Sequence, residues 1–297
     1  MKCACPLLPF FAMVVNFTKM SGAGNDFILL DNRAQTISLD AAQAVRLCDR
    51  HYGIGADGLV LLKPCVSGKA DWAWDFYNSD GSLAEMCGNG ARCFSRFVQR
   101  LTGGQNALTF ETSAGVVTAR FKGEAVSVTL PPPRNLQLHQ IVSLSIGPTV
   151  MHSLDTGVPH AVLFVPDTAL ADVQKIGSEI RRHPHFAPRG TNVNFVQLLA
   201  RNTIRVRTYE RGVEGETLAC GTGVTASALI AAEMHHLQSP VPVQVAGGQL
   251  LEVSFEKNAG QFTSVALSGP ADFVFEGRIE LPEKPGWKAA SPALTKP

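Results

Sequence analysis

The chain has 297 residues and almost balanced charge, with 26 Lys and Arg against 25 Asp and Glu. No block of basic residues stands out, so we expect neither nucleic acid nor a membrane as a partner, and a small molecule is favoured. No apolar run reaches the roughly 18 residues that a membrane-spanning helix needs. The seven cysteines are an odd number without disulfide-framework spacing, which indicates reduced thiols and a cytoplasmic protein.

The first residues resemble an export signal only superficially. The apolar run from Cys3 to Ala12 is short, is interrupted by two prolines and passes directly into a strand-like segment, Val14 to Phe17. We therefore expect residues 1–13 to be a disordered extension and not a cleaved signal. The tail, residues 283–297, is rich in Pro, Lys and Ala and is also expected to be disordered.

A loop of small residues, Ser21 to Asp26, separates the first two predicted strands, Val14 to Phe17 and Phe27 to Asp31. A dinucleotide-binding glycine motif would open a helix, whereas a strand follows here, so we reject that interpretation. A tight turn explains the glycines equally well. It gives no reason for Asn25.

One helix, two strands and a turn are predicted next. Asp40 to Tyr52 has helical periodicity, and its apolar face consists of Ala41, Ala44, Val45 and Cys48. Strands are predicted at Leu59 to Leu62 and at Trp74 to Tyr77. Asn78 opens the following turn, where an Asn usually only caps the turn.

A short sequence motif, called the cysteine phrase below, follows and is repeated in the second half of the chain. Met86 to Ala91 reads Met-Cys-Gly-Asn-Gly-Ala, and Ala219 to Val224 reads Ala-Cys-Gly-Thr-Gly-Val. Each phrase opens an apolar helical stretch, so Cys87 and Cys220 are predicted at helix N-termini. Free backbone N–H groups and the helix dipole stabilise an anion there and lower a thiol pKa below its free value of about 8.5. The sequence predicts two activated thiols.

The stretch between the two phrases begins with a predicted hairpin, Leu108 to Phe121 with Ala125 to Leu130, and a candidate linker, Pro131 to Pro133. Strands near Ile141 to Met151 follow, and then the loop that holds His160. A lone His is most often structural. The repeat aligns this loop with that of Asn25, which makes a functional role about equally plausible.

The second half continues with a predicted helix, Asp172 to Arg182, and a strand, Thr203 to Tyr209, that delivers Glu210 and Arg211 to the second cysteine phrase. A surface Glu-Arg pair is usually only solvated. Beside a thiol at a helix N-terminus, ligand recognition explains the pair better.

The duplication extends beyond the cysteines. Three pairs of landmarks keep equal or nearly equal distances to the two cysteines: Gly24 and Gly157, Gly115 and Gly248, and Tyr77-Asn78 and Tyr209-Glu210. The chain therefore reads as two copies of one unit. We expect an α/β (α+β) fold of two pseudo-symmetric lobes, residues 14–131 and 132–271. Each lobe is a curled, mostly antiparallel sheet around a central helix, with the active site in the cleft between lobes.

Two thiols on opposite sides of one carbon can invert a stereocentre, because one removes a proton as thiolate while the other donates one from the opposite face. Backbone N–H groups at both helix starts could bind a substrate carboxylate and stabilise the charge that grows on it; they belong to Gly88, Asn89, Gly221 and Thr222. Neither half has a Cys/His cluster at metal-ligand spacing, so we expect no metal and no cofactor. Cys93 is assigned to packing.

With these residues in view, the sequence resembles the diaminopimelate epimerase family over about residues 14–280. The resemblance is carried by Gly24 to Phe27, Cys87 to Cys93, Tyr209 to Gly212 and Cys220 to Gly223. It implies a cofactor-independent epimerase of LL- and meso-2,6-diaminopimelate in bacterial lysine and peptidoglycan synthesis, with Cys87 and Cys220 as acid/base residues. It further implies that His160 and Glu210 adjust thiol proton affinity and that the substrate is held by Asn25, Asn78, Asn192, Glu210 and Arg211.

Family resemblance also implies a homodimer and a last strand, residues 272–280, that returns to the first lobe. Two positions depart from some family members: Gly58 replaces a glutamine and Val158 replaces an asparagine, which we interpret as lost contacts at the pocket rim. A proline, hydroxyproline or histidine racemase is the alternative within this fold class. A thiol redox or metal-binding module, or a non-catalytic binding protein, is the alternative from another class.

Overall fold

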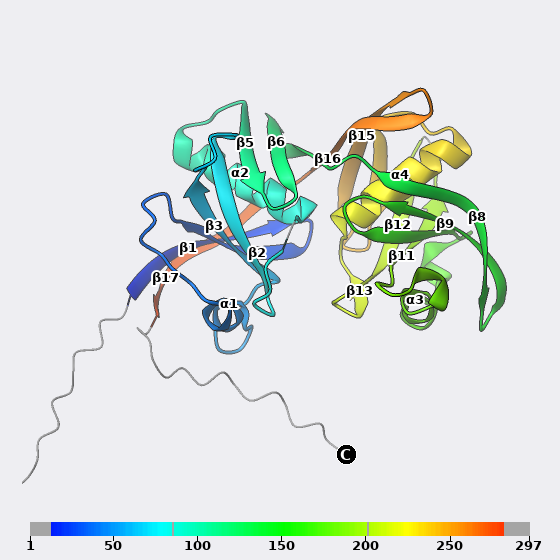
Figure 1. Cartoon of the computed structure of the whole chain (residues 1–297), viewed down its shortest axis with the longest axis horizontal. Helices are drawn as coiled ribbons and strands as arrows, with labels where there is room; N and C mark the ends of the chain where they lie inside the picture. Colours follow the sequence, from blue (N-terminus) through cyan, green and yellow to red (C-terminus); the bar gives the residue numbers. More distant parts are fainter. Residues whose placement is uncertain (1–12, 85, 201, 282–297) are drawn as a thin grey trace, which may run out of the picture.

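Two lobes lie side by side, and in each a curved sheet wraps a central helix (Figure 1). The computed structural model describes residues 13–84, 86–200 and 202–281. The predicted extension, residues 1–13, lies outside the described residues except for Met13, which begins the first strand, and the predicted tail, residues 283–297, lies outside them entirely. The central helices are α2 (Gly88–Thr102) and α4 (Gly221–His235). The predicted fold class is confirmed.

The first lobe contains a sheet in which consecutive strands are hydrogen-bonded neighbours. The strands are β1 (Met13–Gly22), β2 (Asn25–Asp31), β3 (Gly58–Pro64), β4 (Trp72–Asn78), β5 (Ala107–Thr112), β6 (Gly115–Lys122) and β7 (Ala125–Thr129). The pairs β2–β3 and β4–β5 are parallel and the others antiparallel. The parallel pairs need crossover connections, which α1 (Ala41–Cys48) and α2 provide.

The second lobe repeats this plan. Its strands are β8 (Arg134–Leu144), β9 (Gly147–Asp155), β10 (Pro159–Phe164), β11 (Asn192–Leu198), β12 (Ile204–Glu210), β13 (Gly215–Thr217), β14 (Val241–Val245), β15 (Leu250–Asn258) and β16 (Gln261–Gly269). Here β10–β11 and β12–β14 are the parallel pairs. The crossovers contain α3 (Val173–Arg181), with the short 3-10 helices η1 (Thr168–Leu170) and η2 (Pro184–Phe186), and α4.

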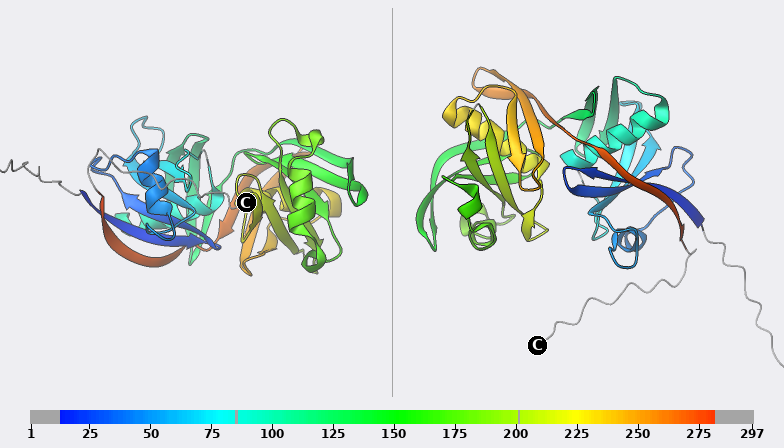
Figure 2. Two further views of the ribbon diagram at one scale, coloured as in Figure 1. Left: turned by 90° about the horizontal axis from the view of Figure 1, so that it is seen from below. Right: turned by 180° about the vertical axis from the view of Figure 1, so that it is seen from behind.

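The last strand, β17 (Asp272–Leu281), pairs antiparallel with β1 from Met13↔Leu281 to Ser21↔Asp272. In the view from behind, β17 runs from the second lobe back across the first (Figure 2). It stands beside β1 as β8 stands beside β9. The lobes are also joined by antiparallel pairing of β7 with β16, between Thr129↔Ala266 and Val126↔Gly269.

The two central helices differ in the side chains that they bury. In α2, Phe94 packs against Trp74 and Phe110, with ring centroids 5.5 and 4.7 Å apart, and the helix ends at Gly103 in the left-handed conformation, which suits glycine. In α4, Ala, Val, Leu and Ile cover almost all faces and are buried. No helix of the described residues is long and apolar enough to cross a membrane.

Several predicted boundaries are wrong. The six-residue loop before Phe27 is a two-residue turn, Ala23-Gly24, with φ of 64° and 88°, because β1 and β2 continue up to it and pair as Gly22↔Asn25. This is the backbone of a hairpin turn whose central residues both have positive φ. The predicted Leu108–Phe121 strand is divided into β5 and β6 by a turn before Gly115. The first helix buries Ala44, Leu47 and Cys48, whereas Ala41 and Val45 are exposed.

Candidate active site

Cys87 and Cys220 are the N-cap residues of α2 and α4, as the sequence predicted, and both have extended backbone conformations. The Gly90 N–H donates to the Cys87 sulfur at 3.5 Å. Cys220 lacks a side-chain cap bond, and its sulfur lies 3.6 Å from Thr222 Oγ1. Each sulfur therefore lies at the positive end of a helix dipole.

The starts of the two helices face each other at close range. A Cβ atom added to Gly221 would lie 3.6 Å from the Gly88 Cα, and one added to Gly88 would lie 3.9 Å from the Gly221 Cα. Leu267 packs against both positions, with its Cδ2 2.9 and 3.0 Å from those added Cβ atoms. Glycine at both sites lets the two helix starts, each preceded by its cysteine, approach each other closely.

The expectation of lowered thiol pKa values is wrong for this structure. Burial raises the pKa of Cys87, and the charge of Glu210 adds to this, although the Gly90 and Asn89 N–H groups and Arg92 act in the opposite direction. Burial likewise raises the pKa of Cys220, with Glu210 the next cause. Loss of hydration outweighs the hydrogen bonds that backbone N–H groups donate to the two sulfurs. The charge of Cys87 is among the groups that raise the Cys220 pKa, so the Cys220 thiol is sensitive to the charge of its counterpart.

Glu210 ends β12 beside Cys220. Its pKa is raised by burial, while hydrogen bonds from Thr217 and Cys220 oppose that rise. Thr217 Oγ1 donates to Glu210 Oε2 at 2.9 Å. Glu210 is thus the carboxyl group whose charge acts on both thiols.

His160 lies fully buried on β10. Its Nδ1 lies 3.3 Å from Asn194 Nδ2, and its Nε2 has no hydrogen-bond partner. Burial and the charge of Arg211 lower the pKa of His160 to about 3, so its imidazole is neutral at pH 7. His160 pairs with Asn192 as Phe27 pairs with Gly58. The strand register therefore equates His160 with Phe27, and not with the loop of Asn25.

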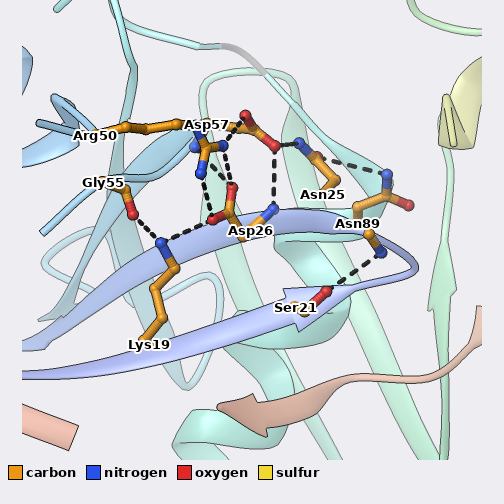
Figure 3. Close-up of polar contacts among 9 residues, drawn as sticks. Lys19, Ser21, Asn25, Asp26, Arg50, Gly55, Asp57 and Asn89 are labelled. Atoms are coloured by element: carbon orange, nitrogen blue, oxygen red, sulfur yellow. Dashed lines mark hydrogen bonds and ion pairs between the residues drawn. The ribbon is translucent and has the colours of Figure 1, made fainter. Parts of the chain in front are cut away.

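Asn25 is the first residue after the hairpin turn. Its Oδ1 accepts from the Cys87 thiol at 3.7 Å and from Asn89 Nδ2 at 3.5 Å, and its Nδ2 donates to Asp57 at 2.6 Å (Figure 3). Asn89 Nδ2 also donates to the Ala219 carbonyl at 3.1 Å. Two amide side chains thus connect the Cys87 sulfur to the segment just before Cys220.

Asn192 and Arg211 are connected in the second lobe. The Arg211 N–H donates to Asn192 Oδ1 at 2.8 Å, and Asn192 Nδ2 donates to the Pro159 carbonyl at 3.1 Å. Arg211 Nη1 reaches the Arg189 carbonyl at 3.3 Å. Arg211 forms no salt bridge within the described part of the chain. Its guanidinium is therefore available to an anionic ligand.

Asn78 and Thr222 hold local structure. Asn78 Nδ2 donates to Ser82 Oγ at 2.9 Å within the predicted turn. In the first lobe, Asn78 pairs with Gly58. In the second lobe, Tyr209 pairs with Val193, so the next residue, Glu210, lies opposite Asn192. Asn78 and Glu210 therefore occupy equivalent positions in the two lobes. The Thr222 carbonyl accepts from Thr156 Oγ1 at 3.0 Å.

Gly58 packs closely against its neighbours. A Cβ atom there would lie 2.6 Å from Phe76 Cε2 and 3.0 Å from the Tyr77 carbonyl oxygen, so a side chain at this position would require Phe76 to shift. The residue before it, Asp57, was not singled out from the sequence, although it bonds Asn25. Only its place in a glycine-bounded loop that enters a strand could have indicated it.

Comparison with known proteins agrees with this arrangement. The family model for diaminopimelate epimerase matches residues 17–134 and 152–274. The diaminopimelate epimerase of Aquifex aeolicus is 41% identical over 276 residues, covering 89% of this chain and 98% of that protein. The enzyme of Acinetobacter baumannii strain AYE is 38% identical over 285 residues, covering 91% and 98%.

Solved structures with low sequence identity share the fold. A Bacillus anthracis phenazine biosynthesis protein of the PhzF family superposes with a TM-score of 0.70 at 14% identity, covering 90% of this chain and 99% of that chain. A hydroxyproline epimerase from Agrobacterium vitis gives 0.68 at 16% identity, covering 91% and 93%. The family assignment rests on the sequence matches, which span nearly the whole chain: this protein belongs to the diaminopimelate epimerase family.

Proposed function

We propose that this protein interconverts LL- and meso-2,6-diaminopimelate by proton transfer at Cα, without a cofactor. The supporting observation is the close approach of two helix starts, each capped by a cysteine, at Gly88 and Gly221. One cysteine, as thiolate, takes the Cα proton, and the other, as thiol, donates a proton to the opposite face. The sulfurs exchange protonation states and the stereocentre is inverted.

The difficulty of the reaction lies in the charge that forms when the α proton leaves. Backbone N–H groups at both helix starts, from Gly88, Asn89, Gly221 and Thr222, are suited to bind the α-carboxylate and stabilise that charge. Glu210 raises the proton affinity of both thiols, which strengthens each as a base. His160, neutral at pH 7, adds no positive charge that would oppose this effect.

The non-reacting end of diaminopimelate carries a second carboxylate and a second ammonium group. Arg211 has no carboxylate partner in the described structure, and its planar guanidinium can bind a carboxylate through two parallel hydrogen bonds. Asn192 holds the Arg211 backbone. Asn25 and Asn78 complete the proposed substrate-binding set. A compact ring substrate such as proline would leave Arg211 without a role.

Isotope exchange tests this function directly. In heavy water, the wild type should introduce deuterium at Cα of LL-diaminopimelate and form the meso isomer. Cys87→Ala and Cys220→Ala should each lose epimerisation by a factor of about 100 to 10,000, as when a positioned acid or base is removed. Cys65→Ala, which lies outside the site, is the control. Undiminished epimerisation by either site variant would disprove the two-thiol mechanism, and activity on proline alone would disprove the substrate.

We also propose a cytoplasmic homodimer. The thiols must be reduced to act, and the five cysteines within the described residues are all free. Within the described strands, β17 has only β1 as a hydrogen-bonded neighbour, and it exposes Phe273, Val274 and Phe275. An exposed apolar edge strand favours association. Light scattering during gel filtration should give about twice the chain mass of 31.8 kDa.

A further inference from the structure

Charged side chains beside Asn25 form one connected network in the first lobe (Figure 3). Lys19 forms a 2.8 Å ion pair with Asp26. Arg50, which follows α1, bonds both Asp26 and Asp57, each at 2.8 Å. The network ends at Asp57 Oδ2, which accepts from Asn25 Nδ2 at 2.6 Å.

The inner part of the network is anchored in the lobe. Lys19 is 5% exposed and donates to the Gly55 carbonyl as well as to Asp26. Burial alone would raise the pKa of Asp26, but hydrogen bonds from Arg50 and Lys19 outweigh burial and hold that pKa well below its usual range. Asp26 therefore stays anionic and holds Arg50 in place, and Arg50 in turn holds Asp57.

The contact with Asp57 determines which way the Asn25 amide faces. A carboxylate only accepts hydrogen bonds, whereas an amide has an NH₂ donor on one side and a carbonyl acceptor on the other. With Nδ2 on Asp57, the Asn25 oxygen must face the other way, toward the Cys87 thiol at 3.7 Å and Asn89 Nδ2 at 3.5 Å. The reversed amide would place its oxygen against the carboxylate and its NH₂ against the NH₂ of Asn89.

We propose that Asp57 is a positioning residue, which acts through Asn25 to keep a carbonyl oxygen directed at the Cys87 thiol. This inference rests on the proposed function of Cys87 as an acid/base residue. The second lobe lacks an equivalent. The counterpart of Asp57 there is Thr191, because Asn192 occupies the position of Gly58. The Thr191 hydroxyl donates to the Asn192 carbonyl at 3.0 Å. Asp57 therefore acts on one face of the substrate only.

Alkylation of the free protein tests the coupling without any substrate. Wild type, Asp57→Asn, Asn25→Ala and the double variant are treated with iodoacetamide at several pH values, and peptide mass spectrometry resolves Cys87 from Cys220. Asp57→Asn should speed alkylation of Cys87 at pH 7 by about three- to tenfold, since a thiol that loses a hydrogen-bond acceptor ionises more easily. Cys220 should change by less than about twofold. Glu210 and Arg92, whose charges also act on Cys87, are retained in all four proteins. The charge of Asp57 also raises the pKa of Glu210, and this route to Cys87 does not pass through Asn25, so it remains in the double variant.

The double variant decides the interpretation. If Asp57 acts through Asn25, Asp57→Asn should add little to Asn25→Ala, because the shared route is already removed. An equal effect of Asp57→Asn with and without Asn25 would overturn the proposal and assign the effect to charge alone. An unchanged Cys87 rate in Asp57→Asn would overturn it as well.

Kinetics provides the second measurement. Asp57→Asn should lower kcat for diaminopimelate by about 10- to 100-fold, as expected for a misplaced reacting group, with a smaller change in KM. Asp31→Asn removes a carboxylate that pairs with Arg33 in the same lobe and is the matched control, with activity near wild type. If the wild type does not epimerise diaminopimelate, the proposed function fails, while the alkylation result still decides the Asp57–Asn25 coupling.

Discussion

The side-chain amide of Asn89 in the first lobe donates a 3.1 Å hydrogen bond to the carbonyl oxygen of Ala219 in the second. Asn89 follows Cys87 by two positions, and Ala219 immediately precedes Cys220. The orientation of the Asn89 amide is fixed by a second hydrogen bond, since Arg92 Nη2 donates to Asn89 Oδ1 at 3.0 Å. This bond therefore connects the two proposed acid/base residues by a short route.

Replacing Asn89 with Ala should cost activity more than stability. The buried Ala219 carbonyl would lose a partner, which costs about 1–3 kcal/mol of unfolding free energy, while the shifted helix starts should lower kcat/KM about 100-fold. Urea unfolding and steady-state kinetics measure the two effects. Asn202→Ala removes a similar amide, which bonds the Gln238 and Pro240 carbonyls in the second lobe. Asn202→Ala should change stability alone. Equal activity losses in both variants would contradict a catalytic role for the hydrogen bond between Asn89 and Ala219.

Replacing Glu210 with Gln should move the pH dependence of catalysis. The charge of Glu210 raises the pKa of both thiols, so its removal lowers both and more thiolate is present at a given pH. The limb on which kcat/KM rises with pH reports the base in the free enzyme, and this limb should move to lower pH in Glu210→Gln. Its maximum should fall, because a substrate contact is lost as well. A shift to higher pH would contradict the electrostatic role.

Replacing His160 with Gln should remove part of the acid sensitivity of folding. The folded-state pKa of His160 is about 3, whereas an unfolded histidine has about 6.5. Between these values only the unfolded chain binds the proton, so wild-type stability falls with decreasing pH by up to about 1.4 kcal/mol per pH unit. Relative to wild type, the variant should gain about 2 kcal/mol between pH 6.5 and 5, and well under about 1 kcal/mol between pH 8 and 6.5. Denaturant unfolding across this range checks the difference, and a constant offset would contradict it.

Adding one methyl group at Gly221 should separate the helix starts. The new Cβ would lie 3.0 Å from Leu267 Cδ2 and 3.4 Å from Asn89 Oδ1, so Leu267 must move or the lobes must part. Overpacking of this kind typically costs about 1–3 kcal/mol, and kcat/KM should fall about 100-fold. At Gly215 an added Cβ meets only Gln174 Oε1, at 4.0 Å, so Gly215→Ala is the control for kinetics and unfolding. Wild-type kcat/KM in Gly221→Ala would show that close approach is not needed.

Much of the fold could be predicted because the duplication repeats local signals. Cysteine followed by glycine and an apolar helical run indicates a helix start in both halves, and α2 and α4 begin there. The position of the turn before Asn25 could be predicted, but its length could not. The turn is short because strands β1 and β2 continue to pair up to Gly22 and Asn25, and the small residues of this segment alone do not predict that pairing.

The electrostatic state of the site could not be predicted from local sequence. A helix N-terminus lowers a thiol pKa, yet burial, which depends on the packing of both lobes, reverses the direction for Cys87 and Cys220. The role of Asp57 could not be predicted from local sequence either. Its partners Asn25 and Arg50 are brought to it by the fold, and nothing in the spacing of these residues along the chain indicates the contact.

The pairing of β17 with β1 also bears on how the protein is made. During synthesis on the ribosome, β1 can pair with β2 at once, but nearly the whole chain must be made before its second neighbour, β17, appears. By contrast, β8 and β9 are adjacent in sequence and can pair at once. Pairing across so large a sequence separation is slow. The second lobe should therefore complete its sheet first, and the nascent first lobe carries an open strand edge that chaperones or a second chain could occupy until translation ends.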